Sequence, residues 1–214
     1  IQGDATMSGG GAVTTVFNNT GTFRKSAGSG TTTLNRDTNG TFNFNNIGRV
    51  EVQSGTLSFA IEGTSPGTFD VASGKVFVFA GRKHTVGTGA LFTGTGTARI
   101  TEGELEVSGN VTASTNTTFE IAHPYAILSG SGNFTASGTT NWTAGRIIGV
   151  TVTIPAGAVM NISGNEGKGF GNNATLTNSG TITWSGTGGI TFSNWVGGSV
   201  TATINNYGTF DIQG

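Results

Sequence analysis

The sequence predicts an all-β fold, and more specifically a parallel β-solenoid. Three observations lead to this prediction. Apolar and polar residues alternate along the whole chain, glycines interrupt the alternation every few residues, and short motifs recur at intervals of about 20–28 residues. Strict alternation is typical of half-buried strands. A repeat of this size is typical of solenoids, in which a turn buries its apolar face only by stacking on its neighbours.

The predicted strands are short, about four or five residues each. In every one, apolar side chains lie on one face, and Thr, Asn, Ser or a charged residue lies on the other. Such segments lie at residues 41–44, 49–52, 56–59, 75–78, 104–107, 151–154 and 175–177. The longest stretch without Gly or Pro, residues 110–123, has no apolar period of 3.6 residues. We therefore expect essentially no helix.

The composition fits an ordered β-protein and excludes several functional classes. Gly, Thr, Asn and Ser make up 112 of the 214 residues, but 14 Phe and 3 Trp are spread through the chain, which is unlike a disordered segment. A net charge of −1 gives no electrostatic footprint for nucleic acid. No apolar run reaches the length of about 18 residues that spans a bilayer. Without Cys, there is neither a disulfide framework nor a thiolate metal site.

Internal repeats distinguish a solenoid from other all-β folds. The motif Asn-x-Gly-x-apolar begins at Asn19, Asn46, Asn178 and Asn206, so its two pairs have spacings of 27 and 28 residues. Asn and Gly suit tight turns, and stacked Asn side chains can form hydrogen-bonded ladders. We predict one domain over residues 1–214, with about 8–11 coils and a length of about 40–50 Å. A β-sandwich is the alternative, because turn signals every 8–12 residues or so also fit that fold.

Several stretches resemble the repeat units of very large bacterial surface proteins. They lie at residues 18–33, 50–57 and 181–188, and the first has the pattern NN-x-GT-F-x-K. The chain is similar in this respect to the filamentous-haemagglutinin-like and autotransporter-passenger-like group. The resemblance covers nearly the whole chain and rests on repeat pattern. It implies a right-handed β-helix that is secreted or held at the cell surface, where it acts as a stalk, adhesin or matrix component.

The tripeptide Ile-Gln-Gly occurs at residues 1–3 and again at residues 212–214. Two such copies are what one unit of a tandem array would show, and chance is the alternative for three residues. We expect the chain to be a fragment or one unit of a larger repeat protein. Exposed edge strands at its ends would then favour end-to-end self-association.

Charged residues give weak signals of catalysis or metal binding. Glu102, Glu104 and Glu106 share one strand face, where carboxylates suit glycoside hydrolysis or Ca²⁺, but a solvated acidic patch is the simpler interpretation. The basic run Arg82–His84 fits a solvated turn better than a ligand loop, and His84 and His123 lack metal-ligand spacing. We expect no cofactor and no metal.

An enzyme of the polysaccharide-active β-helix type remains an alternative. It would need carboxylates beside Arg or Lys in a groove, such as a cluster of Arg49, Glu51, Glu104 and Glu106. The four aspartates lie far apart in the sequence, without a recognisable pair. The prediction is therefore a non-catalytic protein.

The tryptophans are candidate carbohydrate contacts. Trp142, Trp184 and Trp195 lie in the C-terminal half, and exposed indole rings can stack on sugar rings. Because Ile182 and Trp184 share a strand face, a core position is the competing interpretation. Thr-x-Thr pairs such as Thr151/Thr153 are reminiscent of the flat threonine rows of ice-binding solenoids, but their irregular spacing predicts ordinary outward-facing threonines.

Taken together, these features predict a structural or adhesive repeat segment, extracellular or on the bacterial surface. The expected partners are a polysaccharide or the surface of a host or neighbouring cell, without nucleic-acid binding or membrane insertion. A carbohydrate-binding module that uses exposed Trp is the main alternative.

Overall fold

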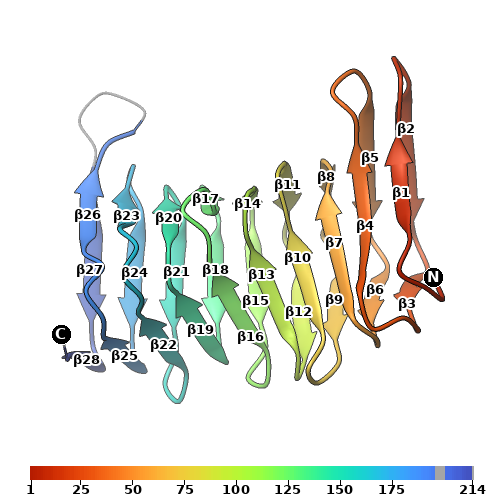
Figure 1. Cartoon of the computed structure of the whole chain (residues 1–214). Coiled ribbons are helices and arrows are strands. Elements are labelled where there is room, and N and C mark those ends of the chain that lie inside the picture. Colours follow the sequence, from red (N-terminus) through yellow and green to blue (C-terminus); the bar gives the residue numbers. More distant parts are fainter. Residues whose placement is uncertain (196–200, 214) are drawn as a thin grey trace.

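The chain winds into a stack of parallel strands around one apolar interior (Figure 1). The structure, a computed structural model, describes residues 1–195 and 201–213. These residues form 28 strands and no helix. In this part of the chain there is accordingly no apolar helix of membrane-spanning length.

Each turn contributes one strand to each of three sheets, which we call sheets 1, 2 and 3 in the order in which the chain visits them. Sheet 1 consists of β1 (Thr6–Gly9), β4 (Thr31–Arg36), β7 (Thr56–Ala60), β10 (Val76–Phe79), β13 (Thr97–Ile100), β16 (Thr118–Ile121), β19 (Thr139–Trp142), β22 (Val159–Ile162), β25 (Thr181–Trp184) and β28 (Thr209–Ile212).

Sheet 2 has two parts that meet at the N-terminal end of the stack. The longer part consists of β8 (Gly63–Thr64), β11 (Lys83–Val86), β14 (Glu104–Val107), β17 (Ile127–Gly130), β20 (Gly145–Ile148), β23 (Lys168–Gly171) and β26 (Ile190–Ser193). The pair β2 (Thr14–Asn19) and β5 (Thr41–Asn46) extends it, because a bridge joins Asn43 to Glu62.

Sheet 3 closes each turn. It consists of β3 (Thr22–Lys25), β6 (Arg49–Val52), β9 (Thr68–Val71), β12 (Leu91–Gly94), β15 (Asn110–Ala113), β18 (Asn133–Ala136), β21 (Thr151–Ile154), β24 (Thr175–Asn178) and β27 (Thr203–Asn206). The described strands thus make nine three-strand turns, with β28 beginning the next.

In-register pairing stacks the inward side chains in columns along the axis. In sheet 1, Phe77 of β10 lies over Leu57 on one side and Ala98 on the other, and all three are fully buried. Aromatic rings bridge the sheets, as where the Phe119 and Phe134 centroids lie 4.6 Å apart. Each turn is too thin to bury these side chains alone, so the core exists only through stacking.

Asparagines stabilise the corners at both ends of the stack. Asn19 donates to the Asn46 side chain at 2.7 Å, and Asn178 donates to the Asn206 side chain at 2.7 Å. The third residue of the motif is glycine because the preceding turn of the solenoid lies close to it. A Cβ on Gly48, for example, would lie 2.8 Å from the Thr20 carbonyl carbon. These contacts are the ladders that the Asn-x-Gly motif predicted.

The prediction of an all-β parallel solenoid without helices is therefore confirmed, and the β-sandwich alternative is wrong. Nine turns lie within the predicted range. Right-handed winding stays a prediction, in keeping with the strong right-handed preference of parallel crossovers.

The threonines are more regular in the structure than in the sequence. Outward positions in sheet 1 form one row, interrupted by Val76 and Val159. The row contains Thr31, Thr56, Thr97, Thr118, Thr139, Thr181 and Thr209. The threonines are irregularly spaced in the sequence because the turns differ in length. In the sheet they align, because the strands pair in register.

Candidate functional site

The outer faces of sheets 1 and 3 carry side chains that mainly support their neighbours. Ion pairs on these faces join adjacent turns: Arg24 to Glu51 at 2.5 Å, and Arg99 to Glu120 at 2.6 Å. Asn161 likewise donates to Asn141 of the preceding turn at 3.0 Å. These ladders account for the polar groups by stacking, without a ligand.

The outer face of sheet 2 is different, because two clefts lie along it. The first has a volume of about 400 Å³ and the second about 360 Å³. Both reach Tyr125, whose residue exposure is 72%. The first is lined by Glu62, Gly81, Arg82, Lys83, Glu102, Gly103, Glu104, Tyr125 and Ile127. The second is lined by Pro124, Tyr125, Gly145, Arg146, Gly167, Lys168, Gly169, Thr191 and Trp195.

An acidic and basic network occupies the first cleft. Glu104 and Glu106 point outward from β14, as their alternation with buried Leu105 and Val107 predicted. Lys83 of the preceding strand lies 2.5 Å from Glu106 and 3.9 Å from Glu104. The hydrogen bond from Lys83 lowers the pKa of the Glu106 carboxyl, and the same contact raises the pKa of Lys83. The carboxylates are thus largely neutralised within the sheet.

Trp195 forms one wall of the second cleft. It follows β26 and lies back across the outer face of β23, where Gly169 and Gly171 occupy the outward positions. A Cβ on Gly169 would lie 2.7 Å from the indole Cη2, and one on Gly171 would lie 3.2 Å from Cζ3. Gly169 therefore forms the floor on which the indole rests, whereas a Cβ on Gly171 would first meet the Ser193 carbonyl.

Arg146 of β20 lies beside the same ring. Its guanidinium carbon is 5.4 Å from the Trp195 ring centroid, the geometry of a cation–π contact. A Cβ on Gly169 would also lie 2.9 Å from Arg146 Cγ. Gly169 thus leaves room for both the stem of Arg146 and the indole.

The predicted tryptophans have three different environments. Trp142 is 1% exposed and belongs to the core, so it offers no ring face to a ligand, in line with the competing core interpretation. Trp184 is half-buried, packs against the core at the C-terminal end, and donates from Nε1 to the Gly188 carbonyl at 3.3 Å. Trp195 is 36% exposed and is the one of the three that lines a cleft.

The basic run at residues 82–84 divides between surface and core. Arg82 and Lys83 line the first cleft, whereas His84 points inward and is 1% exposed. His84 Nε2 lies 2.8 Å from the Ser65 hydroxyl, and burial lowers the pKa of His84 to about 4. His123 pairs instead with Glu102 at 3.5 Å. Within residues 1–195 and 201–213 no His, Asp or Glu cluster is arranged to hold a metal ion.

The cluster of Arg49, Glu51, Glu104 and Glu106 does not form, although Glu102 and Glu104 do lie beside Arg82 and Lys83 in the first cleft. Arg49 and Glu51 lie on sheet 3, paired to each other at 2.9 Å, whereas Glu104 and Glu106 lie on sheet 2. Arg49 also pairs with Asp70 of the following turn. This arrangement repeats the inter-turn ladders of the outer faces.

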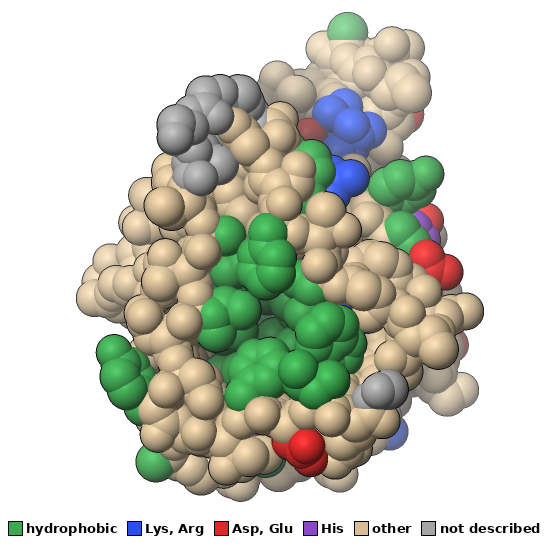
Figure 2. Space-filling view, turned by 90° about the vertical axis from the view of Figure 1, so that its left-hand side faces the viewer, with side chains coloured by type: hydrophobic (Ala, Val, Ile, Leu, Met, Phe, Trp, Pro, Cys, Tyr) green, Lys and Arg blue, Asp and Glu red, His purple; other side chains and the backbone are tan. Residues whose placement is uncertain are grey.

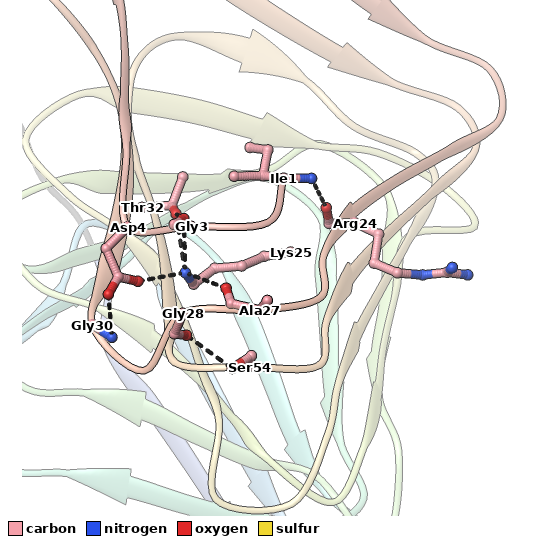
Figure 3. A network of polar contacts seen from close by, with 10 residues as sticks. All are labelled: Ile1, Gly3, Asp4, Arg24, Lys25, Ala27, Gly28, Gly30, Thr32 and Ser54. Atoms are coloured by element: carbon pink, nitrogen blue, oxygen red, sulfur yellow. Dashed lines mark hydrogen bonds and ion pairs between the residues drawn. The ribbon is translucent and has the colours of Figure 1, made fainter.

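A buried lysine organises the N-terminal end of the stack (Figure 3). The side chain of Lys25 is 0% exposed, although it occupies an inward position of β3. Its ammonium contacts Asp4 Oδ1 at 2.8 Å, Thr32 Oγ1 at 3.1 Å, and the carbonyls of Gly3 and Ala27. Asp4 also accepts from the Gly30 amide at 2.9 Å, and these bonds lower the pKa of its carboxyl.

The C-terminal end exposes the apolar interior instead. Viewed along the axis, a hydrophobic patch fills the centre of this end inside a polar ring (Figure 2). Phe192 is 57% exposed, Ile204 37% and Ile212 64%, and Trp184 and Phe210 are half-buried beside them. We call these five residues the C-terminal face.

Comparisons of the chain with family models, with curated proteins and with solved structures find no match. The fold thus stands on the strand pairing described above.

Proposed function

We propose that the chain is a structural and adhesive segment of a large bacterial protein that is secreted or displayed at the cell surface. The observation that carries the proposal is the unbroken parallel stack of nine turns. Ten strands at a spacing of about 4.8 Å give sheet 1 a length of about 43 Å along the axis. A rod of this kind separates what lies at its two ends.

Two properties of the stack favour a structural role for the chain. Backbone hydrogen bonds run along the axis from each turn to the next, as from Thr68 N to the Gly48 carbonyl at 2.9 Å. Buried apolar side chains fill the interior from turn to turn, and aromatic rings predominate among them as far as Phe134, so bending would separate packed side chains. Both properties favour a stiff rod.

The C-terminal face supports end-to-end association. It combines exposed apolar side chains with the unpaired edges of β26, β27 and β28. Edge strands beside apolar surface pair readily with another chain. A further solenoid turn or a second copy would complete both the sheets and the core.

Surface display is tested by labelling intact bacteria that produce the protein with an antibody against the folded chain. We expect labelling without permeabilisation, and loss of the label after brief protease treatment of whole cells. Permeabilised cells are the control for total protein. Label that appears only after permeabilisation would contradict the proposal.

Carbohydrate binding is a second candidate function, which the second cleft of sheet 2 favours. Trp195 and Tyr125 both line that cleft, with residue exposures of 36% and 72%. Aromatic rings offer apolar faces to sugar rings, while Arg146 and Thr191 add hydrogen-bond donors. An adhesive rod and a glycan-binding face are compatible in one molecule.

A further inference from the structure

The positive charges of the chain are distributed unevenly between its faces. Six of the ten Lys and Arg residues form ion pairs: Arg24, Lys25, Arg36, Arg49, Lys83 and Arg99. The other four, which have no carboxylate at ion-pair distance in the described residues, are Lys75, Arg82, Arg146 and Lys168. Three of these four line the clefts of sheet 2. The first cleft is also lined by Glu62, Glu102 and Glu104, whereas the lining of the second contains no carboxylate.

The second cleft contains two of these cations and no carboxylate. Arg146 and Lys168 line it together with two aromatic rings, glycines, Pro124 and Thr191. Lys168 is 2% exposed and donates to the Glu166 carbonyl at 2.9 Å, which uses one of its three donors. Lys168 occupies an inward position of β23 and interacts with Glu166, so Arg146 is the cation that an anionic group in this cleft would meet.

The cleft is a built feature of the fold. Glycines occupy both outward positions of β23, and the adjacent outward position of β20 is Arg146. A side chain at residue 169 would displace the indole, as the distance above shows. The sheet therefore fixes the Trp195 ring against Gly169 with the Arg146 guanidinium over it, and the exposed part of the ring lines the cleft beside that cation.

The two clefts also lie along one line. Tyr125 belongs to both, and their lining residues extend from Lys83 on β11 to Thr191 on β26. Five strand spacings separate β11 from β26 in sheet 2, or about 24 Å. Because Glu62, Glu102 and Glu104 line the first cleft, an acidic ligand is expected in the second cleft.

From these observations we infer that the second cleft of sheet 2 binds an acidic polysaccharide, with a sugar ring against Trp195 and a carboxylate held by Arg146. The inference rests on the second candidate function and names its ligand class. Charge-assisted hydrogen bonds from guanidinium to carboxylate are about twice as strong as neutral ones. The aromatic walls add selectivity for sugar rings over simple polyanions.

The test titrates the full 214-residue chain with a hexamer of galacturonic acid, using calorimetry. The same hexamer with its carboxyls reduced to alcohols, and inorganic polyphosphate of equal charge, are the comparison probes. We expect the carboxylated hexamer to bind at least about tenfold more tightly than the reduced hexamer, because hydrogen bonds to a charged group are stronger than neutral ones.

Three variants separate the contribution of the Arg146 charge, that of the Trp195 ring, and the nonspecific effect of removing a positive charge. Arg146→Gln and Trp195→Ala are each expected to weaken binding of the carboxylated hexamer by about tenfold or more. Lys75→Gln removes the same charge from an unpaired cation outside both clefts and should change the affinity less than about twofold. Unchanged thermal unfolding of each variant shows that the fold is kept.

Each contrary outcome is informative. Equal affinity for the carboxylated and reduced hexamers would overturn the acidic class but leave carbohydrate binding standing. Absence of binding to both hexamers would overturn both. Polyphosphate binding as tight as that of the carboxylated hexamer, and insensitive to Trp195→Ala, would show that charge alone acts and would overturn the inference. Surface labelling of cells is unaffected by any of these results.

Discussion

At the N-terminal end of the solenoid a lysine occupies an inward position, whereas at the C-terminal end the inward positions are aromatic or aliphatic and open to solvent. Lys25 is surrounded by oxygen atoms from the first four residues and from the corner that follows β3. Phe210 and Ile212, at inward positions of β28, have no turn beyond them in the described chain. The two ends therefore differ in degree: at the N-terminal end Met7 is an open inward position beside the Lys25 network, whereas five apolar side chains form the C-terminal face.

The largest expected effect contrasts an interior turn with the C-terminal face. Phe119 and Phe210 occupy the same inward column of sheet 1, but Phe119 is fully buried and Phe210 is half-buried. We expect Phe119→Ala to lower the free energy of unfolding by about 3–5 kcal/mol. Phe210→Ala should cost well under half of that, because solvent already reaches the ring. Urea unfolding followed by circular dichroism measures both, and equal losses would show that the end is as tightly packed as the interior.

The next effect is a pH dependence of stability that comes from His84, which is buried without a carboxylate partner. His84 stays neutral in the fold, whereas the unfolded chain binds a proton below its ordinary pKa of about 6.5. Stability is therefore present above pH 6.5 and is lost as the pH falls toward 4. We expect a loss of about 2 kcal/mol between pH 7 and pH 5.

Two variants isolate that pH dependence. His84→Phe, which places a phenyl ring between Phe59 and Phe79, should flatten the profile between pH 7 and pH 5. His123→Gln changes a partly exposed histidine and should keep the slope of the wild type. A slope that persists in His84→Phe would assign the pH dependence to another group.

A smaller effect is expected at the N-terminal end. Asp4→Asn leaves the Lys25 ammonium buried without its carboxylate, and we expect a lower melting temperature. Lys25→Met removes the charge itself and should be less harmful than Asp4→Asn. Calorimetry of the two single variants and the double variant measures the coupling. A double variant as unstable as the sum of both changes would show that the two side chains act independently.

The sequence predicted the fold well, because alternation and glycine turns depend only on local chemistry. It placed Glu104 and Glu106 on one outer face, and it placed Ile182 and Trp184 on one inward face. The Asn-x-Gly motif likewise marked the corners whose side-chain ladders the structure shows.

Of the candidate site, the sequence predicted Trp195 but not the residues around it. Turns of unequal length hide the register: Thr31 pairs with Thr56 after 25 residues, and Thr97 pairs with Thr118 after 21. For the same reason, the spacing of Gly169, Gly171 and Trp195 does not reveal that the indole lies over the glycines. Tyr125 comes from yet another turn and enters the site only through stacking.

The central claim is that the C-terminal face is an association surface and the N-terminal end is not. Sedimentation velocity across a range of protein concentrations tests it directly, with Ile212→Lys on the C-terminal face and Val16→Lys, an exposed position in the first turn, as the matched pair. We expect the wild type and Val16→Lys to form a dimer as concentration rises, through two C-terminal faces, and Ile212→Lys to stay monomeric. A wild type that remains monomeric throughout, or a dimer that survives in Ile212→Lys, would contradict the account.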